Sequence, residues 1–94
     1  MDSTINKPDL SHLPSKPGVY LHKNSKGEII YVGKAINLKS RVNQYWQKSS
    51  QITSPKTAVL ASESVRVDYL ETPSEIDALF LESELIKRYQ PKFN

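Results

Sequence analysis

Apolar residues along the chain fall into short groups, and three of these groups predict β-strands. Residues 18–22 and 28–33 are rich in β-branched and aromatic side chains. The five residues between them include Asn24 and Gly27, which favour a tight turn, so the two strands are predicted to form a β-hairpin. Residues 65–70 begin with alternating apolar and polar side chains, which predicts a third strand.

A helical spacing follows the predicted hairpin. Leu38, Val42 and Tyr45 recur at intervals of four and three residues, so a helix is predicted from Leu38 to about residue 47. Asn37 directly precedes this stripe and is a suitable N-cap.

Two further helices are predicted from start and stop signals. Residues 49–53 are predicted to form a polar loop, and Ser54-Pro55 then opens a short helix that runs through residue 60. Residues 72–75 fit a capping box with proline at the first helical position. The last helix is predicted to run from there to about residue 89, where Pro91 stops it.

The predicted order is β-β-α-α-β-α, without an internal repeat. We therefore expect an α+β fold with a small three-stranded antiparallel sheet flanked by helices. Residues 1–13 are polar and show no period, and they are predicted to form a flexible N-terminal tail. Residues 14–94 are predicted to form a single domain.

Composition excludes several classes of protein. The 94 residues include no cysteine, which excludes disulfides and thiolate metal sites. The longest apolar runs have four residues, and the N-terminus has no apolar signal region. We therefore expect a soluble, cytoplasmic protein without a membrane partner.

Charge is divided unevenly along the chain. Residues 16–56 contain eight lysines and arginines and one glutamate, whereas residues 57–94 contain four basic and seven acidic residues. A basic first half indicates a surface for a polyanion such as nucleic acid. The alternative is that these lysines only keep the surface solvated.

Two charged residues stand out against their helical neighbours. Glu82 has apolar residues at all its positions three and four away, which predicts that its carboxylate lies on the inward face of the last helix. A buried carboxylate is costly unless a partner or a metal ion is present, and the alternative is that Glu82 reaches water at the edge of the stripe. Arg41 borders the stripe of the first helix, where it could bind a phosphate or extend off the helix edge.

Other catalytic chemistries find little support. Residues 27–34 resemble a P-loop superficially, but the spacing is wrong and Ala35 replaces the hydroxyl residue that would reach magnesium. The two histidines, His12 and His22, form neither a zinc site nor an obvious serine triad. His22 is predicted to be a surface strand residue, although its nearness to Tyr20 leaves a catalytic role open.

The triplets Gly18-Val19-Tyr20 and Tyr31-Val32-Gly33 resemble the signature of the GIY-YIG endonucleases, with valine in place of isoleucine in both. The resemblance extends from Leu13 to Asn94 and is greatest to the N-terminal nuclease domain of the UvrC family of bacterial excinucleases. Each triplet alone is a weak signal, but the ordered set is specific.

The resemblance implies a site. One divalent ion, Mg²⁺ or Mn²⁺, would be held by Glu82 as its only protein ligand, with water in its other positions. Tyr31 would act as general base, assisted by Lys34, and Arg41 would hold the phosphate. The remaining implied site residues would orient water or phosphate, or brace the site: Tyr20, Tyr45 and Asn94.

The resemblance also implies a function. It is that of a metal-dependent DNA endonuclease domain, excised from a longer chain, that makes the 3′ incision of nucleotide excision repair. Its expected partners are DNA and, through missing parts of the chain, other excinuclease subunits; the domain alone is expected to be monomeric. The alternatives are a stand-alone GIY-YIG nuclease of other specificity, a non-catalytic DNA-binding module, and an adaptor whose basic face meets an acidic protein.

Overall fold

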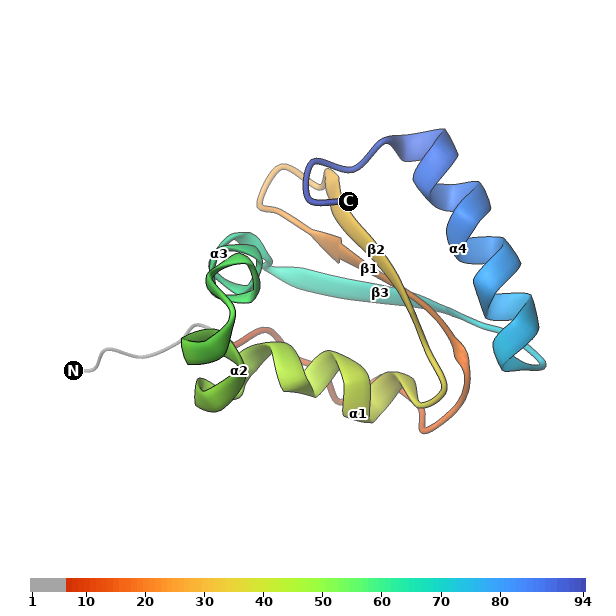
Figure 1. Cartoon of the computed structure of the whole chain (residues 1–94), viewed down its shortest axis with the longest axis horizontal. Coiled ribbons are helices and arrows are strands. Elements are labelled where there is room, and N and C mark those ends of the chain that lie inside the picture. The colour runs from red at the N-terminus through yellow and green to blue at the C-terminus, as the bar shows by residue number, and fades with distance from the viewer. Residues whose placement is uncertain (1–6) are drawn as a thin grey trace.

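The computed structural model describes residues 7–94, which form one antiparallel sheet with helices on both faces (Figure 1). The strands are β1 (Gly18–Lys23), β2 (Ile29–Ala35) and β3 (Arg66–Glu71), and their order is β2-β1-β3. The predicted α+β class and three-stranded antiparallel sheet are therefore confirmed. Five helical segments complete the fold: α1 (Leu38–Asn43), the 3₁₀ turn η1 (Gln44–Trp46), α2 (Lys48–Thr53), α3 (Pro55–Glu63) and α4 (Glu75–Tyr89).

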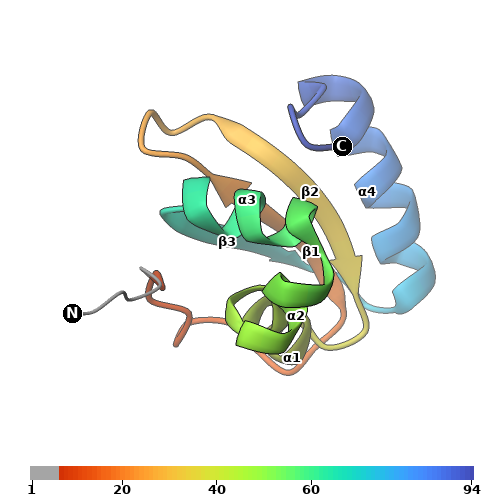
Figure 2. The ribbon, with the colours of Figure 1, turned by 60° about the vertical axis from the view of Figure 1, so that its left-hand side comes forward.

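The central strand β1 separates two hydrophobic clusters. Helix α4 lies on one face of the sheet, and α1, α2 and α3 lie on the other (Figures 1 and 2). Successive side chains of a strand point to opposite faces. Val19 and Leu21 accordingly pack with Ala78 and Leu85 of α4, while Tyr20 belongs to the cluster beneath α1 and α3. Because both faces are covered, β1 is buried along almost its whole length.

The first predicted helix is shorter than expected, and the predicted loop after it is helical. The α-helix ends at Asn43, and the chain tightens into η1 before Gln47 adopts an extended conformation. Residues 49–53, predicted to be a polar loop, belong to α2. The pattern missed α2 because it buries no side chain and so has no apolar stripe; the helix is instead stabilised locally, as where Gln51 Nε2 donates to the Tyr45 carbonyl at 2.9 Å.

The capping prediction for the last helix is wrong by two residues. Ser74, and not Thr72, is the N-cap of α4, and its Oγ accepts from the Asp77 backbone N–H at 3.3 Å. Thr72 instead donates its own backbone N–H to the Pro17 carbonyl at 3.0 Å, which continues the pairing of β3 beyond its last residue. Pro73 therefore precedes the cap and is not the first helical residue.

Part of the predicted N-terminal tail is packed. Leu10 and Leu13 are buried in the core cluster under α1 and α3. The packed part of the chain thus begins before residue 14, where the domain was expected to start. The portion of the predicted tail in residues 1–6 lies outside the described residues. None of the helices within residues 7–94 is long and apolar enough to cross a membrane.

After α4 the chain returns to the outer edge of β2. Gln90 ends the helix in a left-handed conformation with φ of 44°, and Pro91 follows it, as predicted. The Phe93 backbone N–H donates to the Ile30 carbonyl at 2.9 Å. The Asn94 side chain both accepts from the Val32 N–H at 2.8 Å and donates to the Val32 carbonyl at 2.9 Å. The C-terminal segment therefore satisfies backbone groups on the side of β2 that faces away from β1.

Candidate active site

Three tyrosines from different elements meet on the face of the sheet that α1 and α3 cover. Tyr20 comes from β1, Tyr31 from β2 and Tyr45 from η1. The hydroxyls of Tyr20 and Tyr45 are 2.7 Å apart and share a hydrogen bond. The ring of Tyr31 has its centroid 6.3 Å from each of the other two rings. The structure thus brings together three of the residues that the sequence singled out.

The register of the hairpin explains the glycine in the second signature triplet. Gly33 pairs with Tyr20 across β1 and β2, so both residues face the same side of the sheet. A Cβ atom at Gly33 would collide with the ring and hydroxyl of Tyr20. Because Gly33 has no side chain, the Tyr20 ring can lie over this position of β2, where its hydroxyl reaches that of Tyr45.

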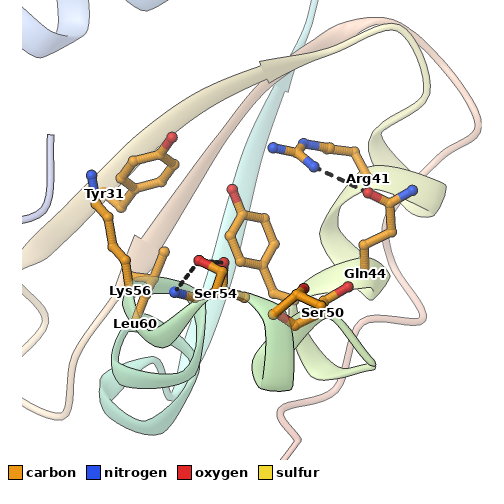
Figure 3. Close-up of a pocket in the computed structure, with 10 residues that line it drawn as sticks. Tyr31, Arg41, Gln44, Ser50, Ser54, Lys56 and Leu60 are labelled. Carbon is orange, nitrogen blue, oxygen red and sulfur yellow. Dashed lines mark hydrogen bonds between the residues drawn. The ribbon is translucent and has the colours of Figure 1, made fainter. Parts of the chain in front are cut away.

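Arg41 of α1 lies against this cluster. Its guanidinium carbon is 5.3 Å from the centroid of the Tyr45 ring, and its Nη1 donates to Gln44 Oε1 at 3.0 Å (Figure 3). The side chain is exposed overall. Arg41 therefore extends off the helix edge, as one sequence alternative predicted, and it places its charge beside the tyrosines; phosphate binding stays a prediction.

The tyrosine hydroxyls are held in their neutral form. Burial raises the pKa of Tyr31 to about 12, with further contributions from Tyr45 and from the negative charge of Glu82, while Arg41 acts in the opposite direction. Burial also raises the pKa of Tyr20 and of Tyr45. In the protein without metal or substrate, the three tyrosine hydroxyls are therefore protonated at neutral pH.

Glu82 approaches the cluster from the other layer of the molecule. It lies on α4, which packs on β1 and β2, and its carboxylate is close enough to raise the pKa of Tyr31. Because β2 is an edge strand, no further strand within residues 7–94 lies between the face that carries Tyr31 and the face that α4 covers, although Phe93 and Asn94 bond its outer edge. Ala78 and Leu85 beside it on the helix are buried, but Leu79 is 47% exposed, so Glu82 lies half-buried at the margin of the packed face.

The surroundings of Glu82 suit a hydrated divalent ion better than a fully protein-bound one. Within residues 7–94, no lysine or arginine forms an ion pair with Glu82, and no three histidine, cysteine, aspartate or glutamate side chains gather at any point. A single half-buried carboxylate that water can reach leaves most positions of a magnesium ion to water, as that ion prefers.

The remaining two predicted site residues lie at the periphery. Lys34 pairs with Val19, whose side chain packs toward α4, so Lys34 projects from the opposite face to the tyrosines and is exposed. The cation that lowers the pKa of Tyr31 is Arg41. Asn94 bonds the backbone of Val32, directly beside Tyr31 on β2.

His22 is the residue that sequence reasoning placed wrongly. It is completely buried, not a surface residue, because β1 is covered on both faces. Its Nδ1 lies 2.8 Å from Ser64 Oγ, and its ring centroid is 4.7 Å from that of Tyr45 and 5.7 Å from Trp46. Burial lowers the pKa of His22 to about 3, so the imidazole that packs against the Tyr45 ring is neutral.

A cavity of about 310 Å³ opens beside the cluster (Figure 3). Tyr31, Arg41, Gln44 and Tyr45 form one side of it. The other side comes from α2 and α3, whose lining residues the sequence analysis did not single out: Ser50, Thr53, Ser54, Lys56, Thr57 and Leu60. They were missed because residues 49–53 were predicted to be a loop; the Ser54-Pro55 helix start was the one signal that pointed there.

A small antiparallel sheet that carries a tyrosine on each hairpin strand, with an arginine and a carboxylate beside them, has the arrangement of a GIY-YIG domain. A family model described as UvrC-like GIY-YIG domain matches residues 16–94. The chain therefore belongs to the UvrC-like GIY-YIG domain family, and the resemblance seen in the sequence is confirmed.

Two bacterial relatives are similar to this chain over most of its length. UvrABC system protein C of Clostridium botulinum is 56% identical over 85 residues, and that of Carboxydothermus hydrogenoformans is 48% identical over 85 residues. Each alignment covers 90% of this chain but only 14% of the relative, so the chain spans about one seventh of their length.

A solved structure shows the same fold. The crystal structure of the GIY-YIG N-terminal endonuclease domain of UvrC from Thermotoga maritima, bound to its catalytic divalent cation magnesium, matches with a TM-score of 0.79 and 34% sequence identity. The match covers 90% of each chain. Because the solved domain is covered almost completely, the similarity extends over the whole domain and not only over its hairpin.

Proposed function

We propose that this chain is a metal-dependent DNA endonuclease domain that hydrolyses a phosphodiester bond. The observation that carries the proposal is the position of Tyr31, which lines one cavity together with Arg41 and whose pKa the Glu82 carboxylate raises. A cation, a proton-carrying hydroxyl and a metal-binding carboxylate are the groups that phosphoryl transfer to water requires. The similar domain from Thermotoga maritima, with its catalytic magnesium, supports the same interpretation.

Glu82 would hold one divalent ion, Mg²⁺ or Mn²⁺. Such an ion supplies stabilisation of the negative charge that develops on the scissile phosphate and on the leaving oxygen. Without the ion, the negative charge of Glu82 raises the pKa of Tyr31 and so disfavours its phenolate form. The positive charge of the ion would offset this effect.

Tyr31 would exchange a proton at its phenolic oxygen. With a pKa of about 12 it is protonated at neutral pH, and positive charge beside it favours the phenolate. As phenolate it would take one proton from the attacking water, whose oxygen bonds to phosphorus while the opposite P–O bond breaks. The departing sugar oxygen would then take a proton from solvent.

The other residues would position the substrate. Arg41 would bind a phosphate oxygen and oppose its negative charge. The Tyr20–Tyr45 pair, held at 2.7 Å and kept neutral, would orient the phosphate or the water. Asn94 would brace β2 at Val32, and Lys34 would attract the DNA backbone from the rim.

A titration of Mn²⁺ or Mg²⁺ followed by NMR tests the site. We expect localised shifts with Mg²⁺, or localised line broadening with paramagnetic Mn²⁺, at Tyr31, Arg41 and the middle of α4 in the wild-type chain, and the loss of either effect in Glu82→Gln. Glu84→Gln is the matched control, because Glu84 is exposed on the same helix. Equal responses in the two variants, or none in the wild-type chain, would contradict the proposed metal site.

At a finer level, we propose that the domain makes the 3′ incision in nucleotide excision repair, as part of a longer chain that meets other excinuclease subunits. The support is the 56% identity to UvrABC system protein C in a region that makes up 14% of that protein. A nicking assay of the full-length protein with its partner subunits on a damaged duplex tests this. Glu82→Gln should abolish the cut on the 3′ side of the damage and no other cut. A non-catalytic DNA-binding module would show no change with that substitution.

A further inference from the structure

The cavity beside the tyrosines has a second wall that the proposed chemistry does not use. Its volume of about 310 Å³ is at the small end for ligand pockets. It opens directly onto Tyr31 and Arg41, so a molecule that occupied it would touch the reacting groups. The space is therefore sized for one unit of a substrate and is continuous with the point of reaction.

The chemistry of the lining is cationic and rich in hydroxyls. Arg41 and Lys56 are its two cations, and none of the ten lining residues is acidic. Lys56 is exposed and extends along the wall toward Tyr31 (Figure 3), and within residues 7–94 it forms no ion pair. An anion is thus the ligand that this wall favours, and a metal cation is not.

Hydroxyl groups and an apolar floor extend the match beyond a bare anion. Ser50 and Ser54 line the cavity, and Ser54 Oγ is fixed by the Thr57 backbone N–H at 3.2 Å and by the Thr57 hydroxyl at 3.0 Å. Leu60 lies beneath them and is 2% exposed. A sugar ring presents hydroxyl or ether oxygens and an apolar face, and a base presents a face that aromatic rings such as Tyr31 can stack on.

We propose that this cavity binds the nucleotide that adjoins the scissile phosphate, on a single DNA strand. Its phosphate lies near Lys56, and its sugar or base lies between Tyr31 and Leu60. The inference rests on the proposed function, because it takes the substrate to be DNA. It goes further in assigning to α2 and α3 the direction from which the strand enters the site.

The test is an NMR titration of the 94-residue chain with a 5′-phosphorylated thymidine dinucleotide. We expect shifts at the Ser50, Ser54 and Thr57 amides, with a dissociation constant on the order of 1 mM. Lys56→Gln should weaken binding about fivefold, the effect of one exposed ion pair. Lys48→Gln is the matched control, because Lys48 is an exposed lysine of α2 that does not line the cavity.

Each outcome decides the matter. Equal weakening by the two lysine variants, shifts confined to other residues, or no shift at up to about 10 mM dinucleotide would overturn the inference. Inorganic phosphate that produced the same shifts with the same affinity would also overturn it, because the site would then bind only an anion. The Mn²⁺ titration of Glu82→Gln is independent of this cavity, so a failure here leaves the proposed metal site standing.

Discussion

At the scale of single residues, the tyrosine cluster depends on groups that never touch a substrate. His22 is the clearest case, because it lies beneath Tyr45 and Trp46 with no exposed surface. An imidazole in this position must stay neutral, since burial makes its charged form costly. The fold therefore holds a titratable group whose proton affinity differs between the folded and unfolded chain.

This difference predicts a pH dependence of stability. The pKa of His22 is about 3 in the folded protein and 6.5 in the unfolded chain. Below about pH 6.5 only the unfolded chain takes up the proton, so the free energy of unfolding should fall as the pH falls, by roughly 2 kcal/mol between pH 8 and pH 5. Urea denaturation at several pH values measures it.

Two variants separate His22 from other titrating groups. His22→Phe should flatten the dependence between pH 5 and pH 8, because phenylalanine does not titrate. His12→Gln is the matched control and should keep it, because His22 remains in place in that variant. An unchanged slope in His22→Phe would contradict the assignment.

Gly33 allows a second prediction at this scale. In Gly33→Ala the new methyl group would displace the Tyr20 ring, and overpacking of this kind costs roughly 1–3 kcal/mol of the free energy of unfolding. We also expect the ring signals of Tyr20 and Tyr45 to shift in the NMR spectrum. Gly27→Ala should leave those signals unchanged, because Gly27 has no neighbour within 4 Å, although its φ of +79° makes that variant strained as well.

At the scale of elements, α4 connects the sheet to the carboxylate of the site. The helix is fixed at its start by Ser74, whose hydroxyl bonds both the backbone and the side chain of Asp77. Its position along β2 decides where Glu82 lies. The stability of this helix end therefore bears on the proposed metal site as well as on the fold.

Replacement of the cap tests this directly. Ser74→Ala should lower the free energy of unfolding by about 1 kcal/mol, the usual cost of losing an N-cap. Ser83→Ala, at an exposed position in the middle of the same helix, should cause no loss. Thermal denaturation followed by circular dichroism compares them, and an equal effect of both variants would argue against Ser74 as the cap.

The sequence predicted elements well wherever burial was regular. The hairpin, the third strand and the last helix were correct because each has an apolar face. It failed where polar side chains determine the structure: α2 buries no residue, and Thr72 was chosen as cap although its N–H is used in the sheet. The Thr72 bond joins residues far apart in the sequence, which no local pattern contains, and α2 lacks the apolar stripe by which a local pattern reveals a helix.

At the scale of the whole molecule, the site joins parts that lie far apart in the sequence. Tyr20, Tyr31 and Tyr45 lie in the basic half, whereas Glu82 comes from the acidic half. The motif resemblance indicated these residues, but their placement on the two faces of the sheet follows from the strand order and from the packing of α4 on β2. The Ser54-Pro55 signal predicted the start of α3, but that α2 and α3 form a cavity wall could not be predicted, because no residue of the wall belongs to a functional motif.

The uneven charge predicts weak, salt-sensitive DNA binding by this chain. Lys39→Gln, in the basic half, should reduce the slope of log K against log salt concentration by about 1 if that lysine contacts a phosphate. Lys87→Gln, in the last turn of α4, should not change it. Fluorescence anisotropy measures both slopes, and equal slopes would contradict this view.

We also expect the isolated chain to cut undamaged duplex poorly or not at all, since few phosphates are contacted. Efficient turnover on such DNA without partners would contradict that expectation.

The bonds between the C-terminal segment and β2 have a consequence for self-association. Phe93 and Asn94 occupy the outer edge of a strand whose sequence Ile29-Ile30-Tyr31-Val32 is apolar and uncharged. An open strand edge of this composition is a template for pairing with another copy. Removal of residues 91–94 should therefore produce aggregates detectable by light scattering, whereas Asn94→Ala, which retains the Phe93 bond, should remain largely dispersed. The same four residues that steady the site would then also keep copies of the protein apart.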